Sequence, residues 1–382
     1  MKYNLADICE YAKGKVDVAI LDEETYISTE NMMPNKGGIT SASSLPTIAQ
    51  TQAFLAGDVL VSNIRPYFKK IWFAEFDGGC SNDVLVFRAK DGVSKRFLYY
   101  VLADDTFFDY SMATSKGTKM PRGDKAAIMK YEVPDFTYEK QEKIAGILEV
   151  LDRKIQLNTE INENLEQQAA SYFHHLFIEN ADPSWAEGAI SDLGTVVGGS
   201  TPSKSKPEYY TDHGIAWITP KDLSVDKSKF IAHGTDDITE LGLRNSSASI
   251  MPPGTVLFSS RAPIGYIAIA DGEVTTNQGF KSVIPKNEVG TAFVYFFLKA
   301  ALPTIESMAS GSTFKEISGG TMRTVPAIIP ADVSLKVFTE FCEPIFQQQR
   351  ILEAENRKLS ALRDSLLPRL MSGELDVSDI DL

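Results

Sequence analysis

The second half of the chain repeats the first, and this repeat limits the folds that the chain can adopt. Short segments of the first half recur in the same order in the second half: GDVLVSNIRP (57–66), FLYYVL (97–102) and EVPDF (132–136) are matched by GTVLFSSRAP (254–263), VYFFL (294–298) and TVPAII (324–329). The offset between matching segments stays at about 190 to 197 residues, which unrelated matches would not maintain. We therefore expect two copies of one folded unit.

The local pattern within each copy predicts a mixed α+β domain. Short β-rich runs bounded by Gly, Pro, Asp and Ser are typical of strands, and they occur at residues 59–64, 84–87, 256–259 and 266–270. Longer aromatic runs at 97–108 and 293–302 are typical of buried helices. With 382 residues, 43% of them hydrophobic, the chain is long enough for each copy to bury its own core.

Each copy is followed by a stretch with the heptad spacing of a long helix. Seam positions recur at steps of three and four in both stretches, at Leu148, Leu151, Ile155, Asn158, Asn162 and Leu165, and again at Ile345, Gln348, Leu352, Glu355, Leu359 and Leu362. A helix of roughly 40 residues is about 60 Å long, which is more than one small domain covers. We expect the two helices to pair along this seam as an antiparallel coiled coil.

Alternatives remain open for these helices at the level of the sequence. Each helix would also be explained by packing on its own domain as an ordinary core helix. Asn158 and Asn162, expected to face Gln348 and Glu355, either fix the register of the pair or are tolerated polar positions. Pro344 is expected to start or kink the second helix rather than lie in its middle.

These patterns divide the chain into five parts. We expect a first α+β domain at 1–136, a central long helix at 137–180, a second α+β domain at 181–333, a C-terminal long helix at 334–373 and an acidic tail at 374–382. Four of the nine residues in this tail are acidic, so we expect an exposed and poorly ordered end.

The composition limits where the protein can work and what it can bind. A count of 38 Lys and Arg against 51 Asp and Glu gives a net charge of −13, which excludes nucleic-acid binding over the whole surface and requires any such site to be local. Cys9, Cys80 and Cys342 lack a C-x-x-C spacing and fit free, buried thiols in a reducing compartment. Because we find no signal-peptide or membrane-span pattern, we expect a cytoplasmic protein.

The long helices carry a family resemblance. YEKQEKIAGILEVLDRKIQLNTEINENLEQQAASYFHHLF (138–177) and LRDSLLPRLMSGELDV (362–377), together with the GDVL and GTVLFS turns, resemble the specificity (S) subunit of type I restriction-modification systems over essentially the whole chain. The resemblance implies two target recognition domains, each of which reads one half of a bipartite DNA site, with a gap set by the helix pair. It also implies a non-catalytic role in host defence.

The resemblance further implies partner subunits. Two methyltransferase (M) subunits would supply DNA methylation from S-adenosylmethionine, and restriction (R) subunits would use ATP and Mg. No cofactor is expected in this chain itself.

DNA recognition needs cations for phosphates and planar polar groups for base edges. In the first copy, two basic segments carry such residues, namely Asn63, Arg65, Tyr67, Lys69 and Lys70, and Lys116, Lys119, Arg122 and Lys125. In the second copy, the candidates are Lys221, Ser260, Arg261, Asn277, Gln278, Thr313 and Lys315. The alternative for the basic segments is solvated surface loop, and for Asn277 and Gln278 it is a turn in which they bond their own backbone.

No catalytic or metal-binding set is predicted. The sequence lacks G-x-x-x-x-G-K-[ST], and MPPGTV (251–256) lacks the amide and aromatic residues of an adenine methyltransferase site. A nuclease-like pattern at Pro134, Asp135, Asp152 and Lys154 places its second half on the heptad helix, so we interpret it as structural. A non-catalytic two-domain scaffold that binds other proteins through its helices remains the alternative function.

Overall fold

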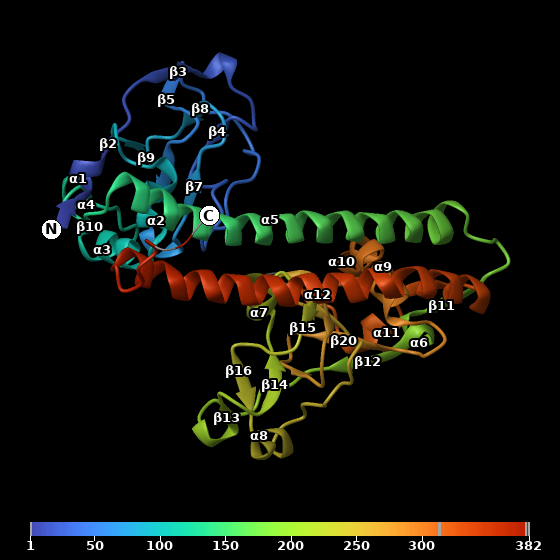
Figure 1. The fold of residues 1–382 in the computed structure, drawn as a ribbon. Coiled ribbons are helices and arrows are strands. Elements are labelled where there is room, and N and C mark those ends of the chain that lie inside the picture. The colour runs from blue at the N-terminus through green and yellow to red at the C-terminus, as the bar shows by residue number, and fades with distance from the viewer. Residues whose placement is uncertain (1, 312–314, 379, 381–382) are drawn as a thin grey trace. The chain divides into compact units, whose positions relative to one another are not determined.

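The fold is described from a computed structural model, which places residues 2–311, 315–378 and 380. The chain divides into two compact units, residues 1–156 with 357–382, and residues 157–356 (Figure 1). Two long helices, α5 (Tyr138–His174) and α12 (Asp332–Met371), each contribute one segment to each unit. Each unit therefore consists of one globular domain and one segment of each long helix.

The first unit contains ten strands and six short helices among the described residues. Its strands are β1 (Lys2–Asn4), β2 (Cys9–Tyr11), β3 (Lys15–Asp17), β4 (Tyr26–Ile27), β5 (Gln50–Phe54), β6 (Val59–Ser62), β7 (Ile71–Phe73), β8 (Gly78–Cys80), β9 (Val84–Ala89) and β10 (Glu132–Pro134). Its helices besides the long pair are α1 (Leu5–Ile8), η1 (Val18–Ile20), η2 (Pro66–Phe68), α2 (Lys95–Ala103), α3 (Asp105–Ala113) and α4 (Lys125–Ile128).

The second unit repeats this order with additional short elements. Its strands are β11 (Ala186–Ala189), β12 (Gly194–Gly198), β13 (Tyr210–Thr211), β14 (Ile215–Ile218), β15 (Phe230–Ile231), β16 (Asp236–Ile238), β17 (Val256–Ser260), β18 (Ile264–Ala270), β19 (Thr275–Thr276), β20 (Lys281–Pro285) and β21 (Pro326–Ile329). Its helices are η3 (His175–Glu179), α6 (Ile190–Leu193), η4 (Pro207–Tyr209), α7 (Pro220–Val225), α8 (Glu240–Arg244), α9 (Thr291–Ala300), α10 (Leu302–Met308) and α11 (Gly319–Arg323).

The sheet topology confirms the repeat. In each unit the first strand pairs antiparallel with the last, as β1 with β10 and β11 with β21. The main sheet runs β2-β9-β6-β7 in the first unit and β12-β20-β17-β18-β15 in the second. A smaller sheet, β3-β5-β8-β4 or β13-β16-β14-β19, completes each domain. The fold class is therefore α+β, as the sequence predicts.

The first short helix of each domain, α1 or α6, begins with the same hydrogen bond between a backbone N–H and a carboxylate. The backbone N–H of Asn4, just before α1, donates to the Asp7 carboxylate at 2.8 Å, and Ala189, just before α6, donates to Asp192 at 2.9 Å. A carboxylate three residues into a helix satisfies a backbone donor that would otherwise lack a partner. The repeat thus extends to how the polypeptide enters each domain.

Alternation along the central strands divides each domain into layers. On β6, Val59 and Val61 share a core with Phe97 of α2 and Phe107 of α3, whereas Leu60 lies in a second core with Phe54 of the smaller sheet. Successive side chains of a strand point to opposite faces, so one strand supplies both cores.

The second domain has the same layering around β17. Val256 and Phe258 share a core with Phe293 of α9, and Leu257 lies in another core with Ile218 of β14. The three cysteines are buried without disulfides, as predicted.

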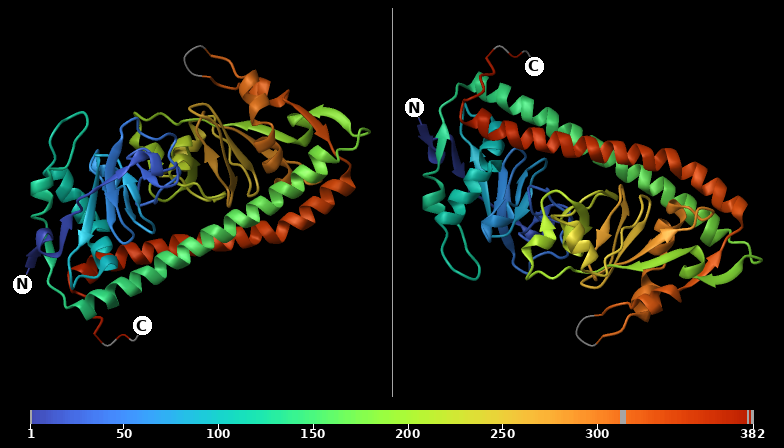
Figure 2. Two further views of the ribbon diagram at one scale, coloured as in Figure 1. Left: turned by 90° about the horizontal axis from the view of Figure 1, so that it is seen from above. Right: turned by 90° about the horizontal axis from the view of Figure 1, so that it is seen from below.

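The long helices pack on both domains and on each other. Leu148 of α5 and Leu367 of α12 lie in the first unit's core, and Phe173 of α5 and Phe338 of α12 lie in the second unit's core. Both alternatives that the sequence leaves open therefore apply: within each unit, the long helices pair with each other and also pack on the domain. In both views of Figure 2, α5 (green) and α12 (red) lie side by side within each unit.

Polar contacts show that the paired segments run antiparallel. In the second unit, Asn158 Nδ2 donates to Glu355 at 2.8 Å, which confirms the predicted facing of these two residues, and Gln349 Nε2 donates to the backbone O of Asn162 at 3.0 Å. In the first unit, Arg363 Nη1 donates to Asp152 at 2.8 Å.

The structure corrects the predicted seam at two positions. Gln348 is exposed and its neighbour Gln349 is 2% exposed, while Leu362 is 47% exposed and Arg363 makes the contact to α5. A shift of one residue turns a helix by about 100°, and the domain surfaces select the face that is buried. The other predicted seam residues are buried or half-buried: Leu148, Leu151, Ile155, Asn158, Asn162, Leu165, Ile345, Leu352, Glu355 and Leu359.

The structure adds detail at the ends of three segments. Pro344 does not start α12, because it lies inside this helix, which begins twelve residues earlier, at Asp332. The first aromatic run forms two helices, because the Asp104 carboxylate accepts the backbone N–H of Thr106 and starts α3. In the described part of the acidic tail, Glu374 and Asp376 are exposed as predicted, but Val377 is buried in the first unit's core and the Lys143 ammonium donates to Ser378 O at 2.7 Å.

Candidate nucleic-acid interface

The two basic segments predicted in the first copy lie against each other. The backbone N–H of Arg65 donates to Pro121 O at 2.8 Å, and Gly123 donates to Asn63 O at 3.2 Å. Lys116 and Arg122 exchange backbone hydrogen bonds at 2.9 and 3.0 Å, which closes the loop between them into a hairpin. Residues more than fifty positions apart in the sequence thus form one surface region, which we call the first hairpin site (residues 63–70 and 116–125).

The turn in this site has an unusual backbone. Arg65 and Lys69 have φ of 51° and flank η2, and Asn35 and Lys36 in a neighbouring loop have φ of 56° and 61°. Among the described residues, Ala262 at 52° is the only other non-glycine residue with positive φ. Such conformations cost energy and cluster at functional sites, which marks this turn as a candidate site on grounds independent of charge.

Most of the predicted cations of this site are already paired with an acid or a carbonyl. Lys116 contacts Asp124 at 2.5 Å, Arg122 contacts Asp83 at 3.1 Å, and Lys69 contacts Asp105 at 2.8 Å. The remaining members differ in their surroundings: Lys70 donates to Thr29 O, Lys125 lies 6.0 Å from the Tyr11 ring, and Lys119 is exposed. Desolvation by burial lowers the pKa of Lys70.

Aromatic side chains project between these cations. Tyr67 is 49% exposed and Phe68 is 37% exposed, with their ring centroids 4.6 Å apart. Exposed aromatic rings beside cations provide stacking surfaces for bases.

The second unit builds the same arrangement from different side chains. Arg261 bridges to Glu316, and Ser310 bridges to Glu316, as Ile64 and Lys116 bridge to Arg122 in the first unit. Ala262, which has positive φ, occupies the position that Arg65 occupies in the other repeat. We call this region the second hairpin site (residues 260–263, 310–311 and 315–316); Lys315 is exposed in it, and Thr313 lies outside the described residues.

The two amide side chains predicted to contact DNA in the second copy, Asn277 and Gln278, make different hydrogen bonds in the structure. Asn277 Oδ1 accepts the backbone N–H of Gly279 at 2.8 Å, which is the turn role left open by the sequence. Gln278 is exposed, and its Oε1 accepts from the Thr201 hydroxyl. Lys221 is exposed on α7.

Two predicted contacts are corrected. Asn63 is 9% exposed and lies beneath Gly123, and Ser260, at the corresponding position of the second repeat, is fully buried. Neither presents a side chain to solvent, because the hairpin that each supports covers it. The backbone oxygens of both residues accept hydrogen bonds from the hairpin strand instead.

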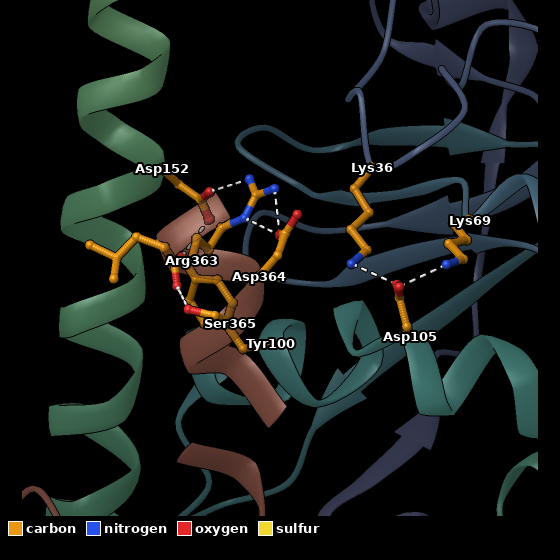
Figure 3. Close-up of polar contacts among 9 residues, drawn as sticks. Lys36, Lys69, Tyr100, Asp105, Asp152, Arg363, Asp364 and Ser365 are labelled. Carbon is orange, nitrogen blue, oxygen red and sulfur yellow. Dashed lines mark hydrogen bonds and ion pairs between the residues drawn. The ribbon is translucent and has the colours of Figure 1, made fainter. Parts of the chain in front are cut away.

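Four residues of the hairpin sites are absent from the predicted set. Asp105 joins the first site through ion pairs with Lys36 and Lys69, as Figure 3 shows. In the second site, Lys281 pairs with Glu316 at 3.6 Å. A turn signal, NKGG at 35–38, precedes the rest of the first site, but spacing alone does not place it beside residue 69.

Neither a metal site nor a membrane-spanning helix occurs in the described part of the chain. No group of three or more His, Cys, Asp and Glu residues is arranged to hold a metal ion within residues 2–311, 315–378 and 380. In the nuclease-like pattern, Asp152 is occupied by Arg363 and Tyr100. No described helix is both long and apolar enough to cross a membrane.

A duplicated α+β domain with the same turn and hairpin in each copy defines a two-domain protein with a repeated surface site. The family model described as type I restriction modification DNA specificity domain matches residues 1–167 and 183–360. The chain therefore belongs to this family and carries two DNA specificity domains.

Individual specificity subunits of type I restriction enzymes are also similar to this chain. The specificity subunit of type I restriction enzyme HindI from Haemophilus influenzae is 26% identical over 461 residues, which covers 98% of this chain and 99% of that protein. The MjaIX specificity subunit from Methanocaldococcus jannaschii is 39% identical over 178 residues, 44% of this chain and 41% of that subunit. The crystal structure of a type I S subunit from M. genitalium shares the fold, with a TM-score of 0.58, 18% identity and coverage of 99% and 96%.

Proposed function

We propose that this chain is the DNA sequence-specificity subunit of a type I restriction-modification complex, and that each globular unit reads one part of a bipartite site. The observation that carries the proposal is the repeated hairpin site, because the same strained turn and bridge occur at matching positions with different side chains. A shared scaffold with variable side chains suits two domains that read different bases.

The chain would act without catalysis of its own. Two methyltransferase subunits would supply methyl transfer from S-adenosylmethionine, and restriction subunits would supply ATP- and Mg-dependent cleavage. The chain's net charge of −13 is consistent with a division of labour in which these partners contribute phosphate contacts. The long helices would set the gap between the two specified parts.

Selection from a randomised duplex library tests the proposal. The chain, alone and co-expressed with a candidate methyltransferase subunit, is used to retain DNA, which is then sequenced. We expect two short motifs separated by a fixed unspecified gap. An intact complex that enriches no sequence would instead support the scaffold alternative.

Substitutions assign the motifs to the units. Arg122→Ala should relax one half of the enriched motif, and Arg261→Ala should relax the other, each by about 1–3 kcal/mol of base discrimination. Lys336→Ala is the control, because Lys336 is an exposed cation on α12 outside both hairpin sites. Relaxation of both halves by either substitution would contradict the assignment of one half to each unit.

A further inference from the structure

In each hairpin site, a single carboxylate contacts two cations. In the first unit, Asp105 contacts Lys36 Nζ at 2.9 Å through one oxygen and Lys69 Nζ at 2.8 Å through the other (Figure 3). In the second unit, Glu316 contacts Arg261 at 3.5 Å and Lys281 at 3.6 Å. The arrangement is thus repeated, although the residues that form it come from different positions in the two repeats.

Backbone hydrogen bonds hold the first of these clusters together. The N–H of Asn35 donates to Phe68 O at 2.8 Å, and the N–H of Lys36 donates to Lys69 O at 2.9 Å. Lys36 and Lys69 both have positive φ, a conformation that persists only where the surroundings enforce it. The backbone around Lys36 and Lys69 therefore places both lysines next to the Asp105 carboxylate.

The second cluster is fixed in a comparable way. Glu316 exchanges backbone hydrogen bonds with Ser310, and the next residue, Ile317, donates its N–H to Ser260 O at 3.1 Å. Lys281 Nζ lies 3.4 Å from the Ser260 hydroxyl and 3.3 Å from Gln278 O. The cations of this cluster thus lie next to Gln278, an exposed residue that is predicted to contact DNA.

In both clusters the carboxylate is more exposed than the lysines it contacts. The side chains of Asp105 and Glu316 are 56% and 39% exposed, whereas those of Lys36 and Lys281 are 16% and 14% exposed. Burial raises the pKa of Asp105, but hydrogen bonds from Lys69 and Lys36 outweigh it, so the pKa lies below its ordinary value and the group is ionised at neutral pH. A phosphate that approaches from solvent therefore meets the carboxylate first and has to displace it to reach the lysines.

We infer that Asp105 and Glu316 compete with DNA phosphate for the cations of the hairpin sites and thereby lower the affinity of the protein for any duplex. The inference rests on the proposed function and adds Lys36 and Lys281 to the interface. Each carboxylate also repels a phosphate that approaches its cations. Stable binding then depends on contacts with bases, which a duplex without the recognised sequence does not provide.

The test measures the affinity of the full chain, in complex with its methyltransferase partner, for a fluorescent duplex that lacks the selected motifs. Asp105→Asn and Glu316→Gln are compared with Asp91→Asn and Glu288→Gln. The control residues are exposed acids just beyond the far ends of β9 and β20, whose near ends adjoin the hairpin sites. They therefore change the net charge equally without touching the clusters.

We expect each cluster substitution to raise the affinity roughly two- to five-fold at low salt, with the gain shrinking as salt screens the charges. The control substitutions should change the affinity much less. An Asp105→Asn variant that binds like Asp91→Asn, or more weakly than the unsubstituted chain, would overturn the inference, because the carboxylate would then be neutral to binding or needed to position the lysines.

A second variant keeps the test informative if removal of a carboxylate disturbs folding. Lys36→Met should weaken binding to the same duplex by roughly two- to five-fold and should cancel most of the gain from Asp105→Asn when the two are combined. Unchanged affinity in Lys36→Met would place this lysine off the DNA surface and overturn the inference. Failure of the proposed function is distinguishable, since in that case the unsubstituted complex enriches no sequence.

Discussion

Asp152 of α5 receives hydrogen bonds from side chains of two other helices of its unit, α12 and α2. Arg363 of α12 donates to one carboxylate oxygen at 2.8 Å, and the Tyr100 hydroxyl of α2 donates to the other at 2.8 Å (Figure 3). In the second unit, Glu166 of α5 has a related role, since it accepts from Tyr295 and Lys299 of α9 and contacts Lys229. In each unit, a carboxylate of α5 thus binds a side chain of the domain's aromatic helix, α2 or α9.

Removal of the arginine at the first of these contacts should destabilise the first unit. Arg363→Met leaves the half-buried Asp152 without its cation, and we expect a loss of about 1–3 kcal/mol in the free energy of unfolding. Chemical denaturation followed by circular dichroism measures the loss. Arg357→Ala, an exposed position on the same helix, should have little effect; equal losses for the two variants would show that the ion pair contributes nothing specific.

The second contact should make stability depend on pH. Burial raises the pKa of Glu166, but the charges of Lys229 and Lys299 outweigh it and lower the pKa below its ordinary value. A carboxyl whose folded pKa is depressed stabilises the fold fully above its unfolded pKa, about 4.3, and loses this contribution as the pH falls through the folded pKa.

Glu166→Gln should therefore cost about 2–4 kcal/mol near pH 7, because it leaves the buried Lys229 without its carboxylate, and the difference from the unsubstituted chain should shrink below about pH 4. Urea unfolding at a series of pH values measures it. Glu163→Gln, an exposed acid on the same helix, is the control. A difference that stays constant down to pH 3 would show that Glu166 is not ionised in the fold.

The exposed aromatic pair should contribute to DNA binding and not to folding. Tyr67→Ala removes a half-exposed ring, so we expect a change in unfolding free energy within about 1 kcal/mol and a loss of DNA affinity of about 1–3 kcal/mol. Tyr138→Ala is a matched control, because Tyr138 is 54% exposed at the start of α5. Equal affinities for the two variants would remove Tyr67 from the interface.

Helix length should set the gap in the recognised sequence. Deletion of one heptad from each long helix, residues 153–159 of α5 and 354–360 of α12, retains the contacts Asp152–Arg363 and Asn162–Gln349. Seven residues correspond to about 10.5 Å of helix, or roughly 3 base pairs of duplex. Library selection with the shortened chain should return both motifs with a gap reduced by about that amount, and an unchanged gap would contradict the proposed role of the helices.

The repeat and the element types were accessible from the sequence because each depends on local order. The runs at 59–64 and 84–87 became β6 and β9, and the heptad stretches became α5 and α12, since periods of two and 3.6 residues are read from neighbouring positions. The composition of the basic segments at 63–70 and 116–125 identifies them as a candidate site, and the structure adds that Arg65 and Lys69 have a strained backbone with positive φ.

The order of residues along the chain is enough to predict two copies of an α+β domain and two long helices. Contacts in the folded protein determine that Gln349 and not Gln348 enters the helix contact, that Asn63 is covered by its own hairpin, and that Lys36 and Lys69 both contact Asp105. The reason is physical: these outcomes depend on which surfaces meet in space, and contacts between residues distant in the chain leave no periodic signal in it.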